Sequence, residues 1–465
     1  MWLGDVEVFR TSTAEPTADG IIWSYVKDLS QYKVLWQEPQ KLIFDLGNLI
    51  DDTYTGSFNV TLMARFSHEK NVRLADIVLP ISTHSSALNL SSAFNLPSQK
   101  AEVSYRFDSR VSRALVSISA CGQSTEEFWW SNVFSSDTGT FDSTVGELYG
   151  HSPFREIQLH IDGILAGVVW PFPIIFTGGV SPGFWRPIVG IDAFDLRMPE
   201  IDISPFLPLL TDGSYHSIEV RVVGLDISLN GTATFSNEVG SYWVVSGNIF
   251  LYLSDGSAEQ LPTSAGPGQR PDIVAPAPTF TTTRYLEQNS TGGNSSLAYS
   301  VLAERFITIR SPDFLWSQNL SFSNVGLFNQ RGLSQKSVQR TSATIFFGPL
   351  GDGDNVDELS FDYPLTVNTT YGDLDGGLTI DAWMRRGLRI DSSGVPGIST
   401  YTFTSGPSHL DISQWGQSSY QSTADNSNST SPGDTSTIIQ SDAGGIAYRR
   451  SVRAVNGTVK SDTET

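Results

Sequence analysis

The sequence is poor in cysteine, in histidine and in positive charge. Its 465 residues include one cysteine, Cys121, so no disulfide can form within the chain. The six histidines are scattered and form no His-Glu-x-x-His motif, so a catalytic zinc site is not expected. Twenty-nine basic residues against forty-nine acidic ones give a net charge of −20, which repels nucleic acid phosphates and anionic membranes. This charge suits a neutral substrate, or work at acidic pH where part of the charge is titrated.

Helix-forming patterns are also nearly absent, and short alternating or apolar runs take their place. Gly, Pro, Asn, Asp and Ser separate these runs, which is the pattern of antiparallel sandwiches or jelly rolls. The sequence therefore predicts an all-β fold. The predicted strands are VEVF (6–9), KLIFDL (41–46), SFNVTLMARF (57–66), ALVSIS (114–119), EIQLHI (156–161), SIEVRVV (217–223), YWVVSGNIFLYL (242–253) and SATIFF (342–347).

Four stretches call for separate interpretation. Residues 255–279 are rich in Pro, Gly and Ser and indicate a linker, whereas 416–437, nearly all small and polar, predict a mobile loop. The segment after Asn456 is expected to fray. Residues 163–185 carry no charge over a membrane-spanning length, but their prolines and glycines would break a helix. We therefore expect a buried strand followed by an apolar loop there.

Three motifs resemble known sites but lack part of each pattern. GVSPG (179–183) matches the hydrolase Gly-x-Ser-x-Gly motif, yet Pro182 follows Ser181 and no helical pattern comes after it. DTGT (137–140) resembles the aspartic-protease motif, but no second Asp-Thr/Ser-Gly occurs, so a hairpin turn is favoured. GDGDNVDE (351–358) could form a loose calcium loop or a solvated acidic turn; an EF-hand fails because Asp357 stands where glycine is needed.

The stretch STEEFWWSNV (124–133) places two acids beside three large aromatic residues. Sugars stack their apolar faces on aromatic rings, and carboxylates accept hydrogen bonds from sugar hydroxyls. On a strand, Glu127 and Trp129 would share one face and could form a sugar-binding wall. Trp185, Arg186 and Asp192 offer the same chemistry. An ordinary amphipathic strand is the alternative interpretation.

Asn-x-Ser/Thr sequons are more frequent than chance predicts, which favours a protein of the secretory pathway. No signal-peptide pattern is present at the start, MWLGDVEVF, so we expect either a cytosolic protein or an incomplete N-terminus. The predicted glycosylation sites are Asn59, Asn89, Asn230, Asn289, Asn294, Asn319, Asn368, Asn428 and Asn456.

Several longer segments resemble the acid-active peptide-N-glycosidase A family, the peptide-N4-(N-acetyl-β-glucosaminyl)asparagine amidases of plants and fungi. The resemblance implies hydrolysis of the amide that joins the first sugar of an N-glycan to asparagine. The glycan leaves as a glycosylamine, Asn becomes Asp, and no metal or cofactor is implied. The expected partner is an N-glycopeptide or glycoprotein substrate, and the chain is expected to be a monomer. The matching segments are RTSTAEPT (10–17), GQSTEEFWWSNV (122–133), FREIQLHIDG (154–163), WPFPIIFTGGVSPGFWRPIVGIDAFDL (170–196) and IDISPFLPLLTDGSYHSIEV (201–220).

A remoter similarity to bacterial peptide-N-glycosidase F implies the arrangement of domains. Two packed antiparallel jelly-roll sandwiches are expected at 1–74 and 75–255, followed by a linker at 256–280 and a further β-rich domain at 281–465. The similarity also implies a principal catalytic Asp just before Met1. We therefore expect that this Asp, the preceding strands and a signal peptide are missing from a truncated N-terminus, and that the first jelly roll is incomplete.

The same resemblance implies that Glu127 holds the position of an essential Glu and that Arg186 lies near a substrate-binding Arg, and the acidic and aromatic pattern supplies other members of the predicted site. A carboxyl group in a partly apolar cleft has a raised pKa, which fits work at acidic pH. The alternative is a glycan-binding β-sandwich without catalysis, or an inactive truncated amidase. The predicted set comprises catalytic Glu127 and Glu126, and substrate-binding Arg186, Trp129, Trp185, Asp192, Arg10 and Glu15.

Overall fold

The protein is built almost entirely of antiparallel β-sheet, which confirms the predicted all-β class. No helix in the described part of the chain is long and apolar enough to cross a bilayer. The computed structural model describes residues 1–14, 20–47, 50–52, 55–66, 74–228, 230–254, 266–350, 357–393, 408–425, 428–443 and 445–465.

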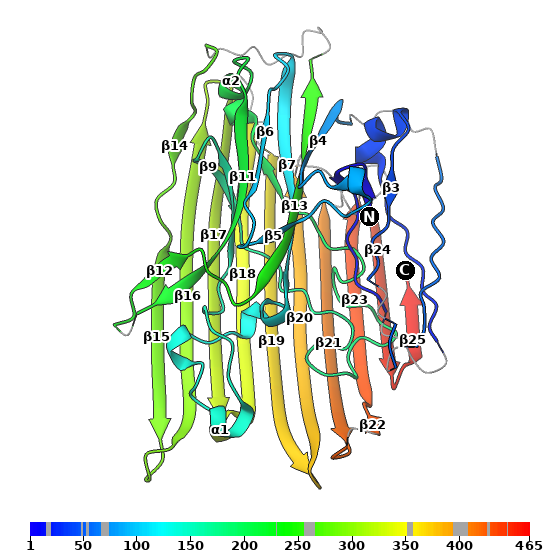
Figure 1. Ribbon diagram of the computed structural model, residues 1–465, viewed down its shortest axis with the longest axis vertical. Helices are drawn as coiled ribbons and strands as arrows, with labels where there is room; N and C mark the ends of the chain where they lie inside the picture. The colour runs from blue at the N-terminus through cyan, green and yellow to red at the C-terminus, as the bar shows by residue number, and fades with distance from the viewer. Residues whose placement is uncertain are drawn as a thin grey trace.

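Two five-stranded sheets form the front of the molecule in Figure 1. The predicted strands at 156–161 and 242–253 are confirmed to the residue. The first sheet, called the β7–β13 sheet, contains β10 (Glu200–Asp202), β7 (Val111–Gln123), β13 (Tyr242–Leu253), β4 (Ile77–Ile81) and β5 (Phe94–Leu96). The second, called the β8–β11 sheet, contains β12 (Ala233–Ser236), β11 (His216–Ile227), β8 (Glu156–Ile161), β9 (Ile164–Val169) and β6 (Ala101–Tyr105).

A twelve-stranded sheet, called the large sheet, lies behind them. Its strands alternate between an inner buried face and an outer exposed face. They are β14 (Asp272–Val274), β15 (Thr279–Gln288), β16 (Asn294–Arg310), β17 (Phe314–Asn329), β18 (Ser334–Pro349), β19 (Asp357–Leu374), β20 (Gly377–Ser393), β21 (His409–Ser422), β22 (Ser429–Thr430), β23 (Gly433–Ala443), β24 (Ile446–Val455) and β25 (Thr458–Glu464).

One continuous hydrophobic core joins the two smaller sheets to the inner face of the large sheet. At its centre, Phe154 lies edge-on to Phe280 and Phe322, with ring centroids 5.4 and 5.1 Å apart. This core contains residues from both sides of the predicted linker. The three predicted domain limits stay a prediction.

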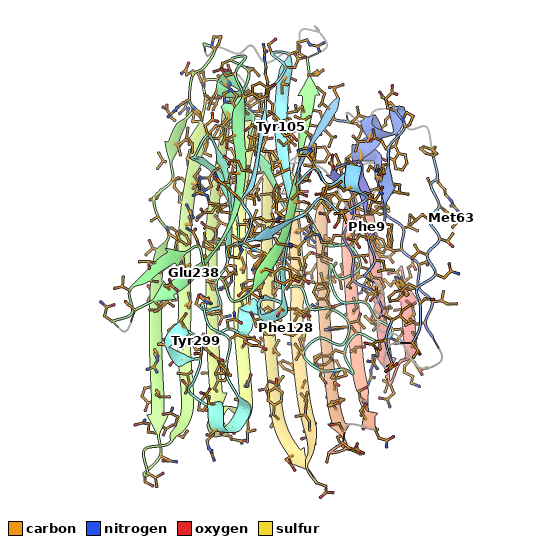
Figure 2. The ribbon with its side chains drawn as sticks, viewed as in Figure 1. Phe9, Met63, Tyr105, Phe128, Glu238 and Tyr299 are labelled. Atoms are coloured by element: carbon orange, nitrogen blue, oxygen red, sulfur yellow. The ribbon has the colours of Figure 1, made fainter. Side chains whose placement is uncertain are left out.

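The first seventy residues add little regular structure. Strands β1 (Trp2–Leu3), β2 (Val6–Glu7) and β3 (Leu42–Ile43) form a small sheet. It packs with Tyr32 against the face of the β7–β13 sheet that points away from the main core. The predicted strand at 57–66 is wrong, because this segment has no strand pairing and leaves Met63 exposed (Figure 2). The jelly-roll arrangement stays a prediction.

The predicted mobile loop at 416–437 is wrong, because most of it belongs to strands β21, β22 and β23. Its small residues serve close packing. A Cβ on Gly416 would lie 3.0 Å from the ring of Phe184, which approaches from the loop after β9. The expected fraying after Asn456 is also wrong, since β25 pairs with β24. By contrast, 163–185 is a strand followed by an apolar loop, as expected.

Short helical turns connect the strands. The 3₁₀ turns are η1 (Ser30–Gln37), η2 (Ser86–Leu88), η3 (Ser124–Glu126), η4 (Trp129–Ser131), η5 (Ser135–Asp137), η6 (Ser204–Phe206) and η7 (Gln330–Gly332). The α-helical turns are α1 (Asp142–Val145) and α2 (Leu207–Leu210).

Candidate active site at the end of strand β7

The acidic and aromatic stretch 124–133 is a pair of helical turns and not a strand. Strand β7 ends at Gln123, Ser124 has a positive φ of 56°, and η3 and η4 follow. The turn folds back so closely that a Cβ on Gly122 would lie 2.3 Å from the carbonyl oxygen of Glu126. The predicted shared strand face of Glu127 and Trp129 is therefore wrong, because strand alternation stops before either residue.

Glu126 is fully buried, and both of its carboxylate oxygens are occupied. Arg155 donates from Nε and Nη2, each at 2.6 Å, to the two oxygens. The indole of Trp243 and the backbone N–H of Gly240 each donate at 2.8 Å. Burial raises the pKa of Glu126, but Arg155 and these hydrogen bonds outweigh burial and hold the pKa below its usual value. Glu126 is therefore suited to fixing the turn and not to proton transfer.

Glu127 has the opposite environment. Its backbone N–H closes the η3 turn on Ser124, while its side chain is half-buried. Burial raises the pKa of its carboxyl group, as expected for a partly apolar site. Among the residues that the structure describes, no side chain or backbone group makes a hydrogen bond or ion pair with this carboxyl group. It is therefore available to a ligand.

Arg10 and Glu7 form a second charged pair close to this turn. Arg10 donates from Nε and Nη2 to the two Glu7 oxygens, each at 2.7 Å, and from Nη1 to the carbonyl of Val244 at 2.7 Å. Val244 pairs with Cys121 across the β7–β13 ladder. Burial raises the pKa of the Cys121 thiol to about 11, and the charges of both Arg10 and Glu127 act on it. Both predicted residues thus lie within electrostatic range of one buried thiol.

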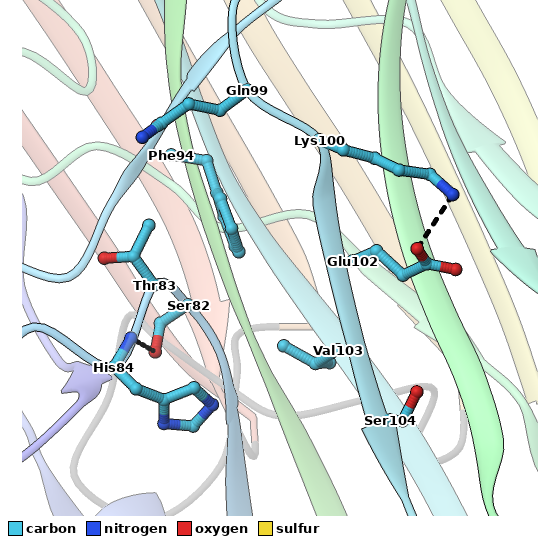
Figure 3. A pocket seen from close by; sticks show the side chains of 9 residues that line it. All are labelled: Ser82, Thr83, His84, Phe94, Gln99, Lys100, Glu102, Val103 and Ser104. Carbon is cyan, nitrogen blue, oxygen red and sulfur yellow. Dashed lines mark hydrogen bonds and ion pairs between the residues drawn. The ribbon is translucent and has the colours of Figure 1, made fainter.

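A hollow of about 530 Å³ opens at the edge of the same sheet (Figure 3). It lies where the neighbour of strand β13 changes from β4 to β5. Lys100 and Glu102 pair across its rim at 2.8 Å. His84 reaches from the hollow toward Asp5, with Nδ1 3.5 Å from the carboxylate. Seven of its nine lining residues are polar in type, which suits hydroxyl-rich ligands; the lining residues are Ser82, Thr83, His84, Phe94, Gln99, Lys100, Glu102, Val103 and Ser104.

The structure does not support a sugar platform at Trp129 and Trp185. Both side chains are buried in the hydrophobic core. The guanidinium of Arg386 lies 4.5 Å from the ring centroid of Trp185, and burial lowers the pKa of Arg386 to about 9. Neither indole ring offers a free face to a ligand. Arg186, directly after Trp185, is half-buried and stays a candidate for sugar binding.

Asp192 and Glu15 are the two other predicted binding residues. Asp192 lies 3.4 Å from Arg197, with its side chain only 5% exposed. Asp192 and Arg197 both line a mostly apolar cavity of about 110 Å³ between the smaller sheets and the large sheet. Asp192 therefore faces the interior and not the turn that carries Glu127. Glu15 lies outside the described residues.

The three weaker motifs do not form the sites that they resemble. Ser181 is buried and lies 2.8 Å from the hydroxyl of Ser418, and no helix follows it. Asp137 ends η5, which corrects the predicted hairpin, and is paired with Arg284. The acidic segment 351–358 lies mostly outside the described residues. Within the described ranges, no cluster of three His, Cys, Asp or Glu side chains could hold a metal ion.

The predicted glycosylation sites all lie at the surface. Eight of the nine sequon asparagines are exposed, and Asn294 is half-buried and donates a hydrogen bond to the carbonyl of Thr140 at 3.0 Å. No sequon would need to unfold the core to accept a sugar. The exposed ones are Asn59, Asn89, Asn230, Asn289, Asn319, Asn368, Asn428 and Asn456.

Sequence reasoning did not single out the residues that hold the turn together. Arg155 is 29 residues from Glu126 and Trp243 is 117 residues from it. The sequence also showed no sign that Glu7 is the partner of Arg10. The one available signal was an arginine directly before the predicted strand, Arg155 in FREIQLHIDG.

Comparison with known proteins adds independent information. A family model described as peptide N-acetyl-β-D-glucosaminyl asparaginase amidase A matches residues 1–269, and one described as PNGase_A C-terminal domain matches residues 298–365. The chain is 31% identical over 366 residues to a protein of Prunus dulcis described as peptide-N4-(N-acetyl-beta-glucosaminyl)asparagine amidase A. The match covers 73% of this chain and 60% of that relative, so the chain spans about three fifths of its length. No solved structure matches.

Proposed function

The chain belongs to the peptide-N-glycosidase A family, and from this membership we propose that it hydrolyses the amide bond between an N-glycan and its asparagine. The products are Asp in the peptide and a glycan that leaves as a glycosylamine. The observation that supports this chemistry best is Glu127, a half-buried carboxyl group with a raised pKa and no partner among the described residues.

Amide hydrolysis needs an oriented water, donors for the oxyanion and an acid for the departing nitrogen. Glu127 orients or activates the water in its ionised form. The proton that Glu127 takes from this water then passes to the departing nitrogen, and the raised pKa of Glu127 makes it a stronger base for the first of these transfers. Arg186 binds the sugar or polarises the carbonyl group.

Glu126 acts on this site through Glu127. Its four hydrogen bonds from Arg155, Trp243 and Gly240 fix the η3 turn, and the next residue in that turn is Glu127. We therefore reassign Glu126 from catalysis to positioning. Because both Arg10 side-chain donors toward Glu7 are occupied, Arg10 also shapes the site and does not bind substrate through those atoms.

The polar hollow beside β5 is the proposed place for the glycan. Its strand β5 pairs with β13 at Trp243–Val245, the same stretch of β13 whose Val244 carbonyl accepts a hydrogen bond from Arg10. Lys100 and Glu102 on its rim supply a donor and an acceptor for sugar hydroxyls. A neutral glycan also suits a protein with a net charge of −20, since no charge attraction is required.

We further propose that the protein passes through the secretory pathway and acts as a monomer. The surface position of the sequon asparagines supports the first point, because each is accessible to glycosylating enzymes. Peptide mapping of protein secreted from a eukaryotic host tests it, and light scattering tests the oligomeric state.

The activity is tested with a glycopeptide at acidic pH and mass spectrometry of the peptide product. Hydrolysis of the side-chain amide raises the mass of the deglycosylated peptide by about one dalton relative to Asn. Glu127→Gln is expected to lower the rate at least about 100-fold, because general acid–base groups contribute on that order or more. Glu147→Gln is the matched control, since Glu147 is an exposed glutamate on another loop.

Two results would contradict the proposal in different ways. Release of glycan by the wild type and undiminished release by Glu127→Gln would remove Glu127 from the mechanism but keep the activity. Tight binding of the glycopeptide with no mass change in the wild type would instead favour the non-catalytic glycan-binding alternative.

A further inference from the structure

The outer face of the large sheet carries two of the sequon asparagines. Inward-facing residues on its strands are buried against the smaller sheets, and the alternate residues point away from them. Asn319 on β17 and Asn368 on β19 are both among the exposed, outward-facing residues. Both lie in the interior of long strands, where the residues across from them are fixed by strand register, whereas Asn294 is the first residue of β16.

Each of these two asparagines lies directly across from an aromatic residue on a neighbouring strand. Asn368 pairs with Trp383 on β20, and Asn319 pairs with Phe306 on β16. Phe306 is 49% exposed and Trp383 is half-buried. Directly opposed residues on one face of an antiparallel pair have Cβ atoms about 4.5–5.5 Å apart. A sugar attached to either asparagine therefore starts beside an accessible aromatic ring.

The surface around Trp383 is also hollowed. A space of about 500 Å³ is lined by the ring, by Asn368 and by polar groups from the next strands. Gln417 lies opposite Trp383 on its other side, and Asp381 accepts a hydrogen bond of 2.6 Å from Ser419. A flat ring bordered by amide and carboxylate groups matches a sugar, which has apolar C–H faces and hydroxyls at its edge.

We propose that N-glycans attached to Asn368 and Asn319 fold back onto the sheet, so that the first sugar stacks on Trp383 or Phe306. In the attachment, the asparagine amide nitrogen loses a proton and bonds to the anomeric carbon of an oligosaccharide. The bond from that carbon to the pyrophosphate of a lipid carrier breaks, and the lipid pyrophosphate leaves. The inference rests on the proposed passage through the secretory pathway and not on the amidase activity.

The stacking would cover apolar surface that the sheet otherwise exposes. Besides Phe306, the outer face exposes Leu302 at 45% and Phe346 at 36%. Phe346 lies diagonally from Asn319, because Asn319 pairs with Thr344 on β18. A broad sheet face with exposed apolar side chains promotes association between copies. A sugar anchored over these rings would keep the face covered and hydrated.

The test compares protein secreted from a eukaryotic host with unglycosylated protein made in bacteria. Trp383→Leu and Phe306→Leu remove the ring but keep an apolar side chain. Each is expected to lower the Tm of the glycosylated protein by about 1–2 °C more than that of the bare protein, since contacts of this size shift the Tm of a large chain only slightly. Trp415→Leu is the matched control. Trp415 lies on the same outer face of β21, paired with Arg385 and Ser436 and with no sequon directly across.

Glycopeptide mapping and proton NMR complete the experiment. Stacking is supported if a sugar is found at Asn368 and the protons of its first sugar unit are shifted upfield. The ring current of Trp383 causes such a shift, so it should be lost in Trp383→Leu, and a purely structural role of Trp383 would not produce it. Equal Tm losses in the glycosylated and bare proteins, or an unmodified Asn368, overturn the proposal. None of these readouts depends on whether the amidase assay succeeds.

Discussion

Two ion pairs, one beside the smaller sheets and one on the outer face of the large sheet, differ in how far they are buried. In the smaller sheets, Glu126 and Arg155 are both fully buried and make a bidentate pair. On the large sheet, Arg340 and Asp362 pair across neighbouring strands in the open, with Arg340 66% exposed. Buried pairs cost desolvation energy and are retained where a geometry must be fixed, whereas exposed pairs add little. The buried pair lies at the turn that carries Glu127.

The two regions also differ in how their strands are connected. On the large sheet, β16, β17 and β18 follow one another in adjacent hairpins with short turns. Between β9 and β10, by contrast, residues 170–199 form a long irregular segment that contains Arg186 and Asp192. Functional groups in proteins concentrate on such segments when a rigid scaffold holds them. The large sheet supplies that scaffold through the shared core.

The largest expected effect comes from breaking the buried pair. Arg155→Met leaves the Glu126 carboxylate buried without its cation, which should lower the free energy of unfolding by about 3–5 kcal/mol. Urea denaturation followed by circular dichroism measures this. The double variant Glu126→Leu/Arg155→Met should recover most of the loss. A cost below about 1 kcal/mol for the single variant would show that the pair behaves like a surface pair.

A smaller loss is expected at the second buried ion pair, Glu7–Arg10. Arg10→Met removes the partner of buried Glu7, but Arg10 is itself 14% exposed and Ser246 still donates to Glu7. We expect the free energy of unfolding to fall by about 2–3 kcal/mol. Activity measured at a temperature where the variant is folded should also fall, since the Glu7–Arg10 pair borders the site. Unchanged activity would restrict the pair to a structural role.

The two adjacent glutamates should have opposite effects on the pH dependence of stability. The pKa of Glu126 is lowered on folding, so its contribution is present above its usual pKa of 4.5 and is lost as pH falls through the folded pKa. The pKa of Glu127 is raised on folding, so its ionisation removes stability as pH rises above 4.5.

Glu127→Gln should therefore raise the urea midpoint at pH 7 and leave it unchanged near pH 3. Glu126→Gln should lower the midpoint at pH 7. If both variants shift the midpoint in the same direction at pH 7, the structural distinction between the two residues is wrong.

The smallest effect is expected on the large sheet. Arg340→Gln removes an exposed cross-strand pair with Asp362, so the free energy of unfolding should change by less than about 1 kcal/mol. The same urea titration as for Arg155→Met gives the comparison directly. A loss as large as that of Arg155→Met would mean that the exposure of an ion pair does not determine how much the pair contributes to stability.

Local patterns were sufficient for two strands that are buried on both faces. EIQLHI and YWVVSGNIFLYL were placed to the residue, because both are rich in strand-forming residues and each is followed by turn residues. The same reasoning failed at 416–437, where small polar residues lie in central strands because neighbouring loops pack closely on them. It failed again at Gln123, since the turn that ends β7 depends on Ser124 adopting a positive φ.

The sequence by itself determined the all-β class, the family resemblance that the comparisons bear out, and a carboxyl group beside aromatic residues near the end of β7. It did not determine which of two adjacent glutamates is available. Only the tertiary structure decided this, by bringing Arg155 and Trp243 onto Glu126 and leaving Glu127 half-buried without them. The physical reason is that sheet register unites residues far apart in the chain, and a carboxylate's protonation and availability depend on those distant partners.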